Sequence, residues 1–139
     1  MAPAVLIADA DWDLCDLYWR FFSHRGWQVR TSGAGLECLT QLRQCSPHLL
    51  ILDLRLPWGG ADGLLAVMRD DPGLARIPVI LTSTEAFPEA LSSLISPPVV
   101  KVLWKPFSLT ALFDIMCSEL RKGYQGWSMG SRNLASPGL

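Results

Sequence analysis

The sequence has no excess of positive charge, because 12 lysines and arginines stand against 13 aspartates and glutamates over 139 residues. A protein that holds nucleic acid by neutralising its phosphates needs a basic face. Direct binding of DNA or RNA is therefore not expected. Half of the residues are apolar, which is enough for one domain with its own hydrophobic core.

Long apolar runs are also missing. Charged residues or prolines interrupt every apolar stretch well short of the roughly 20 residues that cross a bilayer. The first residues lack the basic segment of a signal peptide, and their apolar stretch already meets an acid at Asp9. The sequence thus predicts a cytoplasmic protein with no membrane contact.

Cysteine pairs of the C-x-x-C kind are absent. The four cysteines all lie inside apolar periodic stretches, at Cys15, Cys38, Cys45 and Cys117. That placement favours buried free thiols over disulfides or zinc ligands, as in a reducing cytosol.

Five short apolar segments are present and have the length of strands. Four are mainly apolar and one alternates with polar residues, and they cover residues 5–8, 27–31, 49–52, 77–81 and 99–104. Stretches with helical spacing lie between and after them, the least clear at 88–95, where Pro88 suits a first turn. This alternation predicts an α/β domain with a doubly wound, five-stranded parallel sheet and helices on both faces. The domain is expected over 1–122, with a flexible glycine- and serine-rich tail over 123–139.

Polar side chains follow four of the predicted strands, at the edge where ligands bind in open α/β sheets. They are Asp9 and Asp11 after the first strand, Asp53 after the third, Thr82 with Ser83 after the fourth, and Lys105 after the fifth. Carboxylates suit Mg²⁺, whereas a lysine and a hydroxyl suit phosphoryl oxygens. The pattern therefore indicates a site for a hard cation and a phosphoryl group.

These motifs resemble the receiver domain of two-component response regulators, of the chemotaxis-regulator kind, over about residues 5–120. The similarity lies in an apolar strand ending in an acid, a strand with a phosphoacceptor aspartate, a turn into a helix, a strand with a switch hydroxyl, and a Lys-Pro-Phe signature. They stand at 5–9, 50–57, 62–64, 78–83 and 104–107. The resemblance implies a flavodoxin-like sheet with the strand order 2-1-3-4-5.

The resemblance also implies a function. A stand-alone receiver would accept a phosphoryl group on Asp53 from a sensor histidine kinase or a phosphotransfer protein, and would signal by binding an unidentified downstream protein. The phosphoryl group would be contacted by Thr82, Ser83 and Lys105. Mg²⁺ would be held by Asp9, Asp11, Asp53 and the backbone carbonyl of Arg55, with Pro106 in a structural role after a cis bond. Such a chain is not an enzyme beyond slow self-dephosphorylation.

The sequence departs from the family pattern after the first strand. Members usually carry two adjacent acids there, whereas Ala10 follows Asp9 and the next acid is Asp11. Asp11 can either bend back to the metal or cap the following helix, and Mg²⁺ would have one carboxylate fewer in the second case. A chain that keeps the fold but not the metal would be a pseudo-receiver, an interaction module that works without phosphorylation.

Two further departures concern signalling and chemistry. The loop over 56–63 is longer than usual and rich in glycine, and the aromatic switch position is Val102. A local conformational switch is therefore expected. An aspartate-nucleophile phosphatase of the haloacid dehalogenase type is a weaker alternative, because Arg55 stands where that family has its general acid.

Overall fold

The computed structural model describes residues 2–84 and 89–127, which build one parallel sheet with helices on both faces. Its strands are β1 (Ala4–Ala8), β2 (Gln28–Ser32), β3 (Leu49–Asp53), β4 (Val79–Ser83) and β5 (Val99–Trp104). The helices are α1 (Trp12–Ser23), α2 (Gly35–Cys45), α3 (Gly60–Asp70), α4 (Leu109–Trp127) and the short 3₁₀ helix η1 (Glu89–Leu94). The strand order is β2-β1-β3-β4-β5, which confirms the predicted fold.

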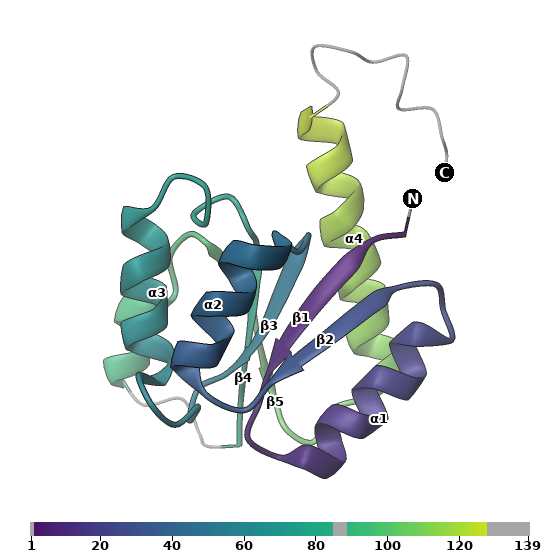
Figure 1. Cartoon of the computed structure of the whole chain (residues 1–139), viewed down its shortest axis with the longest axis horizontal. Coiled ribbons are helices and arrows are strands. Elements are labelled where there is room, and N and C mark those ends of the chain that lie inside the picture. Colours follow the sequence, from purple (N-terminus) through teal and green to yellow (C-terminus); the bar gives the residue numbers. More distant parts are fainter. Residues whose placement is uncertain (1, 85–88, 128–139) are drawn as a thin grey trace.

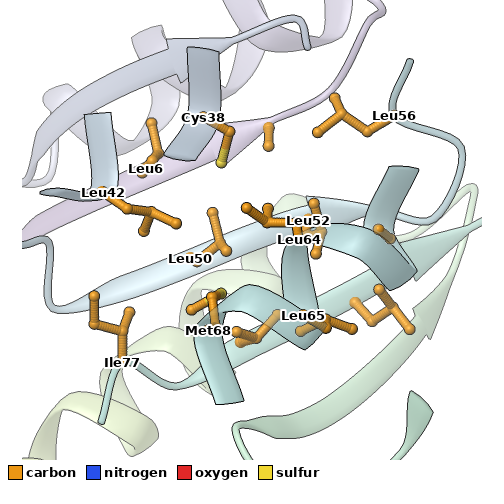
Figure 2. Packing of buried hydrophobic residues seen from close by; sticks show 14 of the residues in the cluster. Leu6, Cys38, Leu42, Leu50, Leu52, Leu56, Leu64, Leu65, Met68 and Ile77 are labelled. Atoms are coloured by element: carbon orange, nitrogen blue, oxygen red, sulfur yellow. The ribbon is translucent and has the colours of Figure 1, made fainter. Parts of the chain in front are cut away.

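The sheet separates two apolar cores. On one face, α2 and α3 cover a cluster that includes Leu42, Leu50, Leu65 and Met68 (Figure 2). The other face is covered by α1 and α4 (Figure 1). They enclose a second cluster, in which Tyr18 and Phe22 are fully buried. Continuous apolar runs form the central strands because both faces of those strands are buried.

Strand alternation decides on which face the polar strand ends emerge. Successive side chains of a strand point to opposite faces. Ile7, Ile51 and Ile80 belong to the cluster under α1 and α4. Residues two positions further on therefore face the same way, and they are Asp9, Asp53 and Thr82.

The segment before β5 differs from the sequence-based expectation. A helix was expected over 88–95; Pro88 lies outside the described residues, and Glu89–Leu94 form a 3₁₀ helix instead. Arg69 of α3 donates hydrogen bonds to three carbonyls at the end of this segment, those of Leu94, Ser96 and Pro97, at 2.9–3.2 Å. The guanidinium thus holds η1 and the following turn against α3.

The end of the domain, expected at residue 122, stays a prediction. Helix α4 continues to Trp127, beyond the expected boundary at residue 122. The rest of the expected tail, 128–139, lies outside the described residues. Across the described part of the chain, no helix is long and apolar enough to span a membrane.

All four cysteines are free thiols, as predicted. Burial raises the pKa of the Cys15 thiol to about 11 and that of Cys38 to about 12. Cys45 and Cys117 are only half-buried, which corrects the expectation that all four would be buried. Cys45 is the last residue of α2, where the helix leaves the core.

Strand β5 lies at one edge of the sheet and carries an irregularity. Val79 pairs with Val99, but the next residue of β4, Ile80, pairs with Lys101. Val100 is thus an extra residue in the ladder, which makes a β-bulge at the start of the edge strand.

Candidate functional site

Two aspartates at adjacent strand ends form the centre of the site. Asp9 follows β1, and its backbone N–H donates to the carbonyl of Ser32 at 2.9 Å, which fixes the strand end beside β2. Asp53 ends β3 and pairs in register with Thr82 of β4. Both carboxylates emerge on the α1 and α4 face, so the sheet alone brings together two of the predicted acids.

Lys105 joins the two aspartates. Its Nζ lies 2.6 Å from Oδ2 of Asp9 and 3.7 Å from Oδ1 of Asp53. The lysine side chain is only 14% exposed, so both ion pairs are largely removed from water. The backbone N–H of Lys105 donates to the carbonyl of Ser83 at 2.8 Å, and the Lys105–Pro106 bond is cis, as the resemblance implies.

Thr82 is buried beside this group, and its hydroxyl oxygen has no hydrogen-bond partner among the described residues. A buried hydroxyl without a partner is unfavourable, and such groups commonly mark a site where a ligand or water completes the bonding. Ser83 is also buried, but alternation sends its side chain to the opposite face of the sheet. The structure therefore brings Thr82, and not Ser83, to the face that holds the two acids.

Asp11 caps helix α1. Its Oδ1 accepts a hydrogen bond from the backbone N–H of Leu14 at 3.1 Å, and its own backbone N–H donates to Oδ1 of Asp9 at 2.9 Å. Of the two roles considered for Asp11, the structure shows the helix cap. The carboxylate of Asp11 is thus engaged at the helix start and does not join Asp9 and Asp53.

The environment of Asp53 favours its protonated form more than water does. Burial raises the pKa of the Asp53 carboxyl, and the carboxylate of Asp9 raises it further. Lys105 and the backbone N–H of Arg55 counteract this by stabilising the charge. The Asp53 carboxylate therefore lies close to the negative charge of Asp9, and Lys105 and the Arg55 N–H offset that repulsion only in part.

The oxygen atoms at these strand ends fit a Mg²⁺ site in which the protein supplies only two carboxylates. Mg²⁺ commonly takes one or two protein carboxylates and completes its octahedron with water and phosphoryl oxygens. Asp9 and Asp53 can supply two carboxylates, and Arg55, two residues after Asp53, can supply a backbone carbonyl. Among the described residues, no group of three or more aspartate, glutamate, histidine or cysteine side chains could hold a metal ion. Ala10 and the capping role of Asp11 account for the missing third acid.

Aromatic packing under the site was not predicted from the sequence. Phe107, which follows Lys105–Pro106, stacks on Tyr18 of α1 with ring centroids 6.3 Å apart and planes inclined by 9°. The buried hydroxyl of Tyr18 has no hydrogen-bond partner in the described part of the chain. The Lys-Pro-Phe motif contained the only hint of this packing in the sequence. Because Lys105 points into the site, the nearby Phe107 ring needs an apolar surface to pack against.

A flavodoxin-like sheet with acids after β1 and β3, a hydroxyl on β4 and a lysine after β5 defines the class of receiver domains. The profile of the response regulator receiver domain family matches residues 5–116, most of the chain. The chain belongs to this family, whose members act in two-component signalling.

Individual relatives agree with this assignment. A protein-glutamate methylesterase/protein-glutamine glutaminase of Rhodopseudomonas palustris (strain BisB18) is 33% identical over 121 residues, which cover 83% of this chain but 32% of that protein. The chain thus spans about a third of that relative. Protein Rrf1 of Nitratidesulfovibrio vulgaris is 26% identical, with 88% of each chain covered.

Solved structures support the fold. A signal receiver domain from Vibrio parahaemolyticus, assigned to a Luxo repressor protein, superposes with a TM-score of 0.82 over 91% of this chain and 95% of that one. The sequence identity is 20%, so this likeness concerns the fold alone.

Proposed function

We propose that the chain is a phosphoacceptor receiver in which Asp53 takes a phosphoryl group from a sensor histidine kinase or a phosphotransfer protein. One observation carries the proposal: the ammonium of Lys105 lies between the carboxylates of Asp9 and Asp53, 2.6 Å from one and 3.7 Å from the other. A carboxylate attacks a polyanionic donor slowly unless cations offset the repulsion. Lys105 is placed to provide one such cation.

The transfer exchanges one bond for another. A carboxylate oxygen of Asp53 forms a bond to phosphorus, while the P–N bond of a phosphohistidine breaks and its electron pair returns to the imidazole. The product on Asp53 is an acyl phosphate. Lys105 can pair with the new phosphoryl oxygens, and the hydroxyl of Thr82, which lacks a partner among the described residues, can donate to another.

Mg²⁺ bound by Asp9, Asp53 and the Arg55 carbonyl would neutralise phosphoryl charge. Both carboxylate oxygens of Asp9 already accept hydrogen bonds, Oδ2 from the Lys105 ammonium and Oδ1 from the Asp11 N–H. A metal at Asp9 therefore competes with an internal ammonium, so we propose that Mg²⁺ binds weakly before Lys105 turns to a phosphoryl group.

The proposed partners are cytoplasmic proteins. They comprise the phosphoryl donor and a downstream protein that distinguishes the two phosphorylation states. The chain itself would perform no catalysis beyond slow hydrolysis of its own acyl phosphate. The activities of the longer relatives are not part of this proposal.

Acetyl phosphate tests the proposal without a cognate kinase. Incubation with acetyl phosphate and Mg²⁺ should add one phosphoryl group to the intact mass, and the group should be stable to acid and labile to base. Asp53→Asn should remove the addition, whereas Asp62→Asn, a change of the same kind at an exposed acid, should leave it. Equal phosphorylation of Asp53→Asn and the parent chain would refute the assignment.

An interaction module without phosphoryl chemistry is the second candidate. It is favoured by Ala10 and by the capping role of Asp11, which reduce the acids available to a metal. The absence of any phosphoryl addition in the parent chain, at several Mg²⁺ concentrations, would support this candidate. A phosphatase is less favoured, because Arg55 replaces the general acid that such turnover requires.

A further inference from the structure

Three large apolar side chains stand in solvent around the loop between β2 and α2. Trp12 is 72% exposed, Leu36 69% and Trp58 76%. They come from the start of α1, the start of α2 and the loop before α3, and we call them the tryptophan surface. An exposed apolar group of this kind on a folded domain marks an interaction site more often than a structural need.

The backbone places these residues close together. A Cβ atom at Gly33 would stand 3.7 Å from the indole ring of Trp12, and a Cβ at Gly35 would collide with the carbonyl oxygen of Trp58. The N–H of Gly35 donates to the carbonyl of Pro57 at 2.8 Å, which ties the two loops to each other. Leu36 follows Gly35 directly, so Trp12, Leu36 and Trp58 all lie near one short segment of backbone.

Trp58 occupies an unfavourable backbone conformation. Its φ is +57°, and Gly59 and Gly60 follow with φ of +111° and +64°. A bulky residue in the left-handed region is unfavourable relative to glycine or asparagine. Because the Trp58 side chain is also largely in solvent, it gains little from burial. Trp58 therefore keeps a strained backbone without stabilising the core. Such strain is often found at residues that bind a partner or ligand.

Carboxylates surround the tryptophan surface. Glu37 accepts a hydrogen bond from the N–H of Gly33 at 3.1 Å, next to the Trp12 ring. Asp13 follows Trp12 in the first turn of α1. The Oδ1 atom of Asp62 lies against Gly60, two residues after Trp58. Indole faces and carboxylates together attract cations, because a guanidinium or ammonium gains both cation–π and ionic contacts.

We propose that the tryptophan surface binds an arginine- or lysine-bearing amphipathic segment of a partner protein. The apolar side of such a segment would cover Trp12, Leu36 and Trp58, and its basic side chains would meet Asp13, Glu37 and Asp62. Charge complementarity selects this occupant over a second copy of the chain, because two copies would bring like charges together. The residues of this surface are not among those of the proposed phosphoacceptor site, so the proposal goes beyond that function.

A designed peptide can serve as the probe. We would titrate a labelled amphipathic peptide of leucine and arginine into the full chain, and a peptide with glutamate in place of arginine as its control, following fluorescence anisotropy. The arginine peptide should bind, weaken with salt, and lose about tenfold in affinity for the double variant Trp12→Ala, Trp58→Ala. Asp13→Asn with Asp62→Asn should also weaken binding of the arginine peptide.

Trp19→Ala is the matched control, because Trp19 is also half-exposed on α1 but lies outside the tryptophan surface. It should leave the affinity of the arginine peptide unchanged. Circular dichroism melting would confirm that each variant is folded. Equal losses for Trp19→Ala, binding of the glutamate peptide, or a dimer that the double variant dissociates would each overturn the proposal.

Discussion

At the scale of single residues, Asp53 shows how a candidate functional group can oppose stability. Burial and the neighbouring Asp9 carboxylate raise the pKa of Asp53 above its ordinary value of 3.8. The folded state then binds a proton more tightly than the unfolded state does. The free energy of unfolding therefore falls as the pH rises from below that ordinary value through the raised pKa, and this loss persists at neutral pH.

We accordingly expect Asp53→Asn to raise the melting temperature at neutral pH, because it removes a buried charge beside Asp9. The gain should disappear near pH 3, below both pKa values. Thermal melts at a series of pH values measure this difference. Asp62→Asn is the control, and a gain at Asp53 that does not vary with pH would contradict the electrostatic explanation.

Ala10 offers a second test at this scale. Ala10→Asp adds a carboxylate beside Asp9 and should tighten Mg²⁺ binding about tenfold, since ligand charge and number set affinity for this ion. Tryptophan fluorescence can follow the titration, because Trp12 lies two residues away. Ala10→Asn separates charge from size and should change little. Equal affinities in all three chains would remove Ala10 as the cause of weak binding.

Much of the candidate site could be predicted at this scale, because each of its residues directly follows one of the predicted apolar segments: Asp9, Asp53, Thr82 and Lys105. What could not be predicted was the use of Asp11. A carboxylate just before α1 can serve either as the cap of that helix or as a metal ligand. The 3.1 Å hydrogen bond from the Leu14 N–H to Asp11 shows the cap, and only the structure reveals it. The pairing of Lys105 with Asp9 also required the structure, since 96 residues separate them.

At the scale of elements, the contact between the β2–α2 and β3–α3 loops depends on one glycine. No Cβ fits at Gly35 without displacing the Trp58 backbone. The backbone cannot yield as a flexible side chain can, so Gly35→Ala should destabilise the fold by about 1–3 kcal/mol.

Gly63 provides the matched comparison. It lies in α3, and nothing is within 4 Å of a Cβ built there. Gly63→Ala should therefore stabilise the fold by about 0.5–1 kcal/mol through helix propensity. Urea denaturation of both variants measures the two values. A Gly35→Ala chain as stable as the parent would show that the two loops separate freely.

The elements also show where sequence patterns fail. Strands β1, β3 and β4 follow from apolar runs because they are largely buried, whereas the edge strands β2 and β5 are only partly buried. The stretch before β5 has neither the length nor the periodicity to separate an α-helix from a 3₁₀ helix. Its conformation depends on Arg69, which bonds carbonyls 25 to 28 residues away. No local pattern could indicate that contact.

At the scale of the whole molecule, the loop after β3 and strand β5 differ in backbone conformation. Three successive positive φ angles lie in the loop from Trp58 to Gly60. Strand β5 is instead bonded to β4 along its length and has Val102 at the aromatic switch position. A conformational signal from Asp53 should therefore travel through the β3–α3 loop.

Hydrogen exchange can locate that signal. We expect beryllofluoride, which stands in for the phosphoryl group on Asp53, to change amide protection most over residues 58–63 and least over 99–103. Asp53→Asn with the same reagent is the control and should show no change. A larger change across β5 than across the loop would restore the aromatic-switch route that is usual in the family.

The bulge at Val100 has a consequence for how the chain meets other molecules. A bare strand edge can recruit a strand from a second chain, and this is a common beginning of aggregation. Here the outer strand begins after Pro97–Pro98, carries the extra residue Val100 and then Lys101, so its free amides and carbonyls do not present an even row. Regular strand addition is hindered from the first residues of β5. Recognition at this edge of the sheet must therefore rely on side chains at the surface, and not on the addition of a strand to β5.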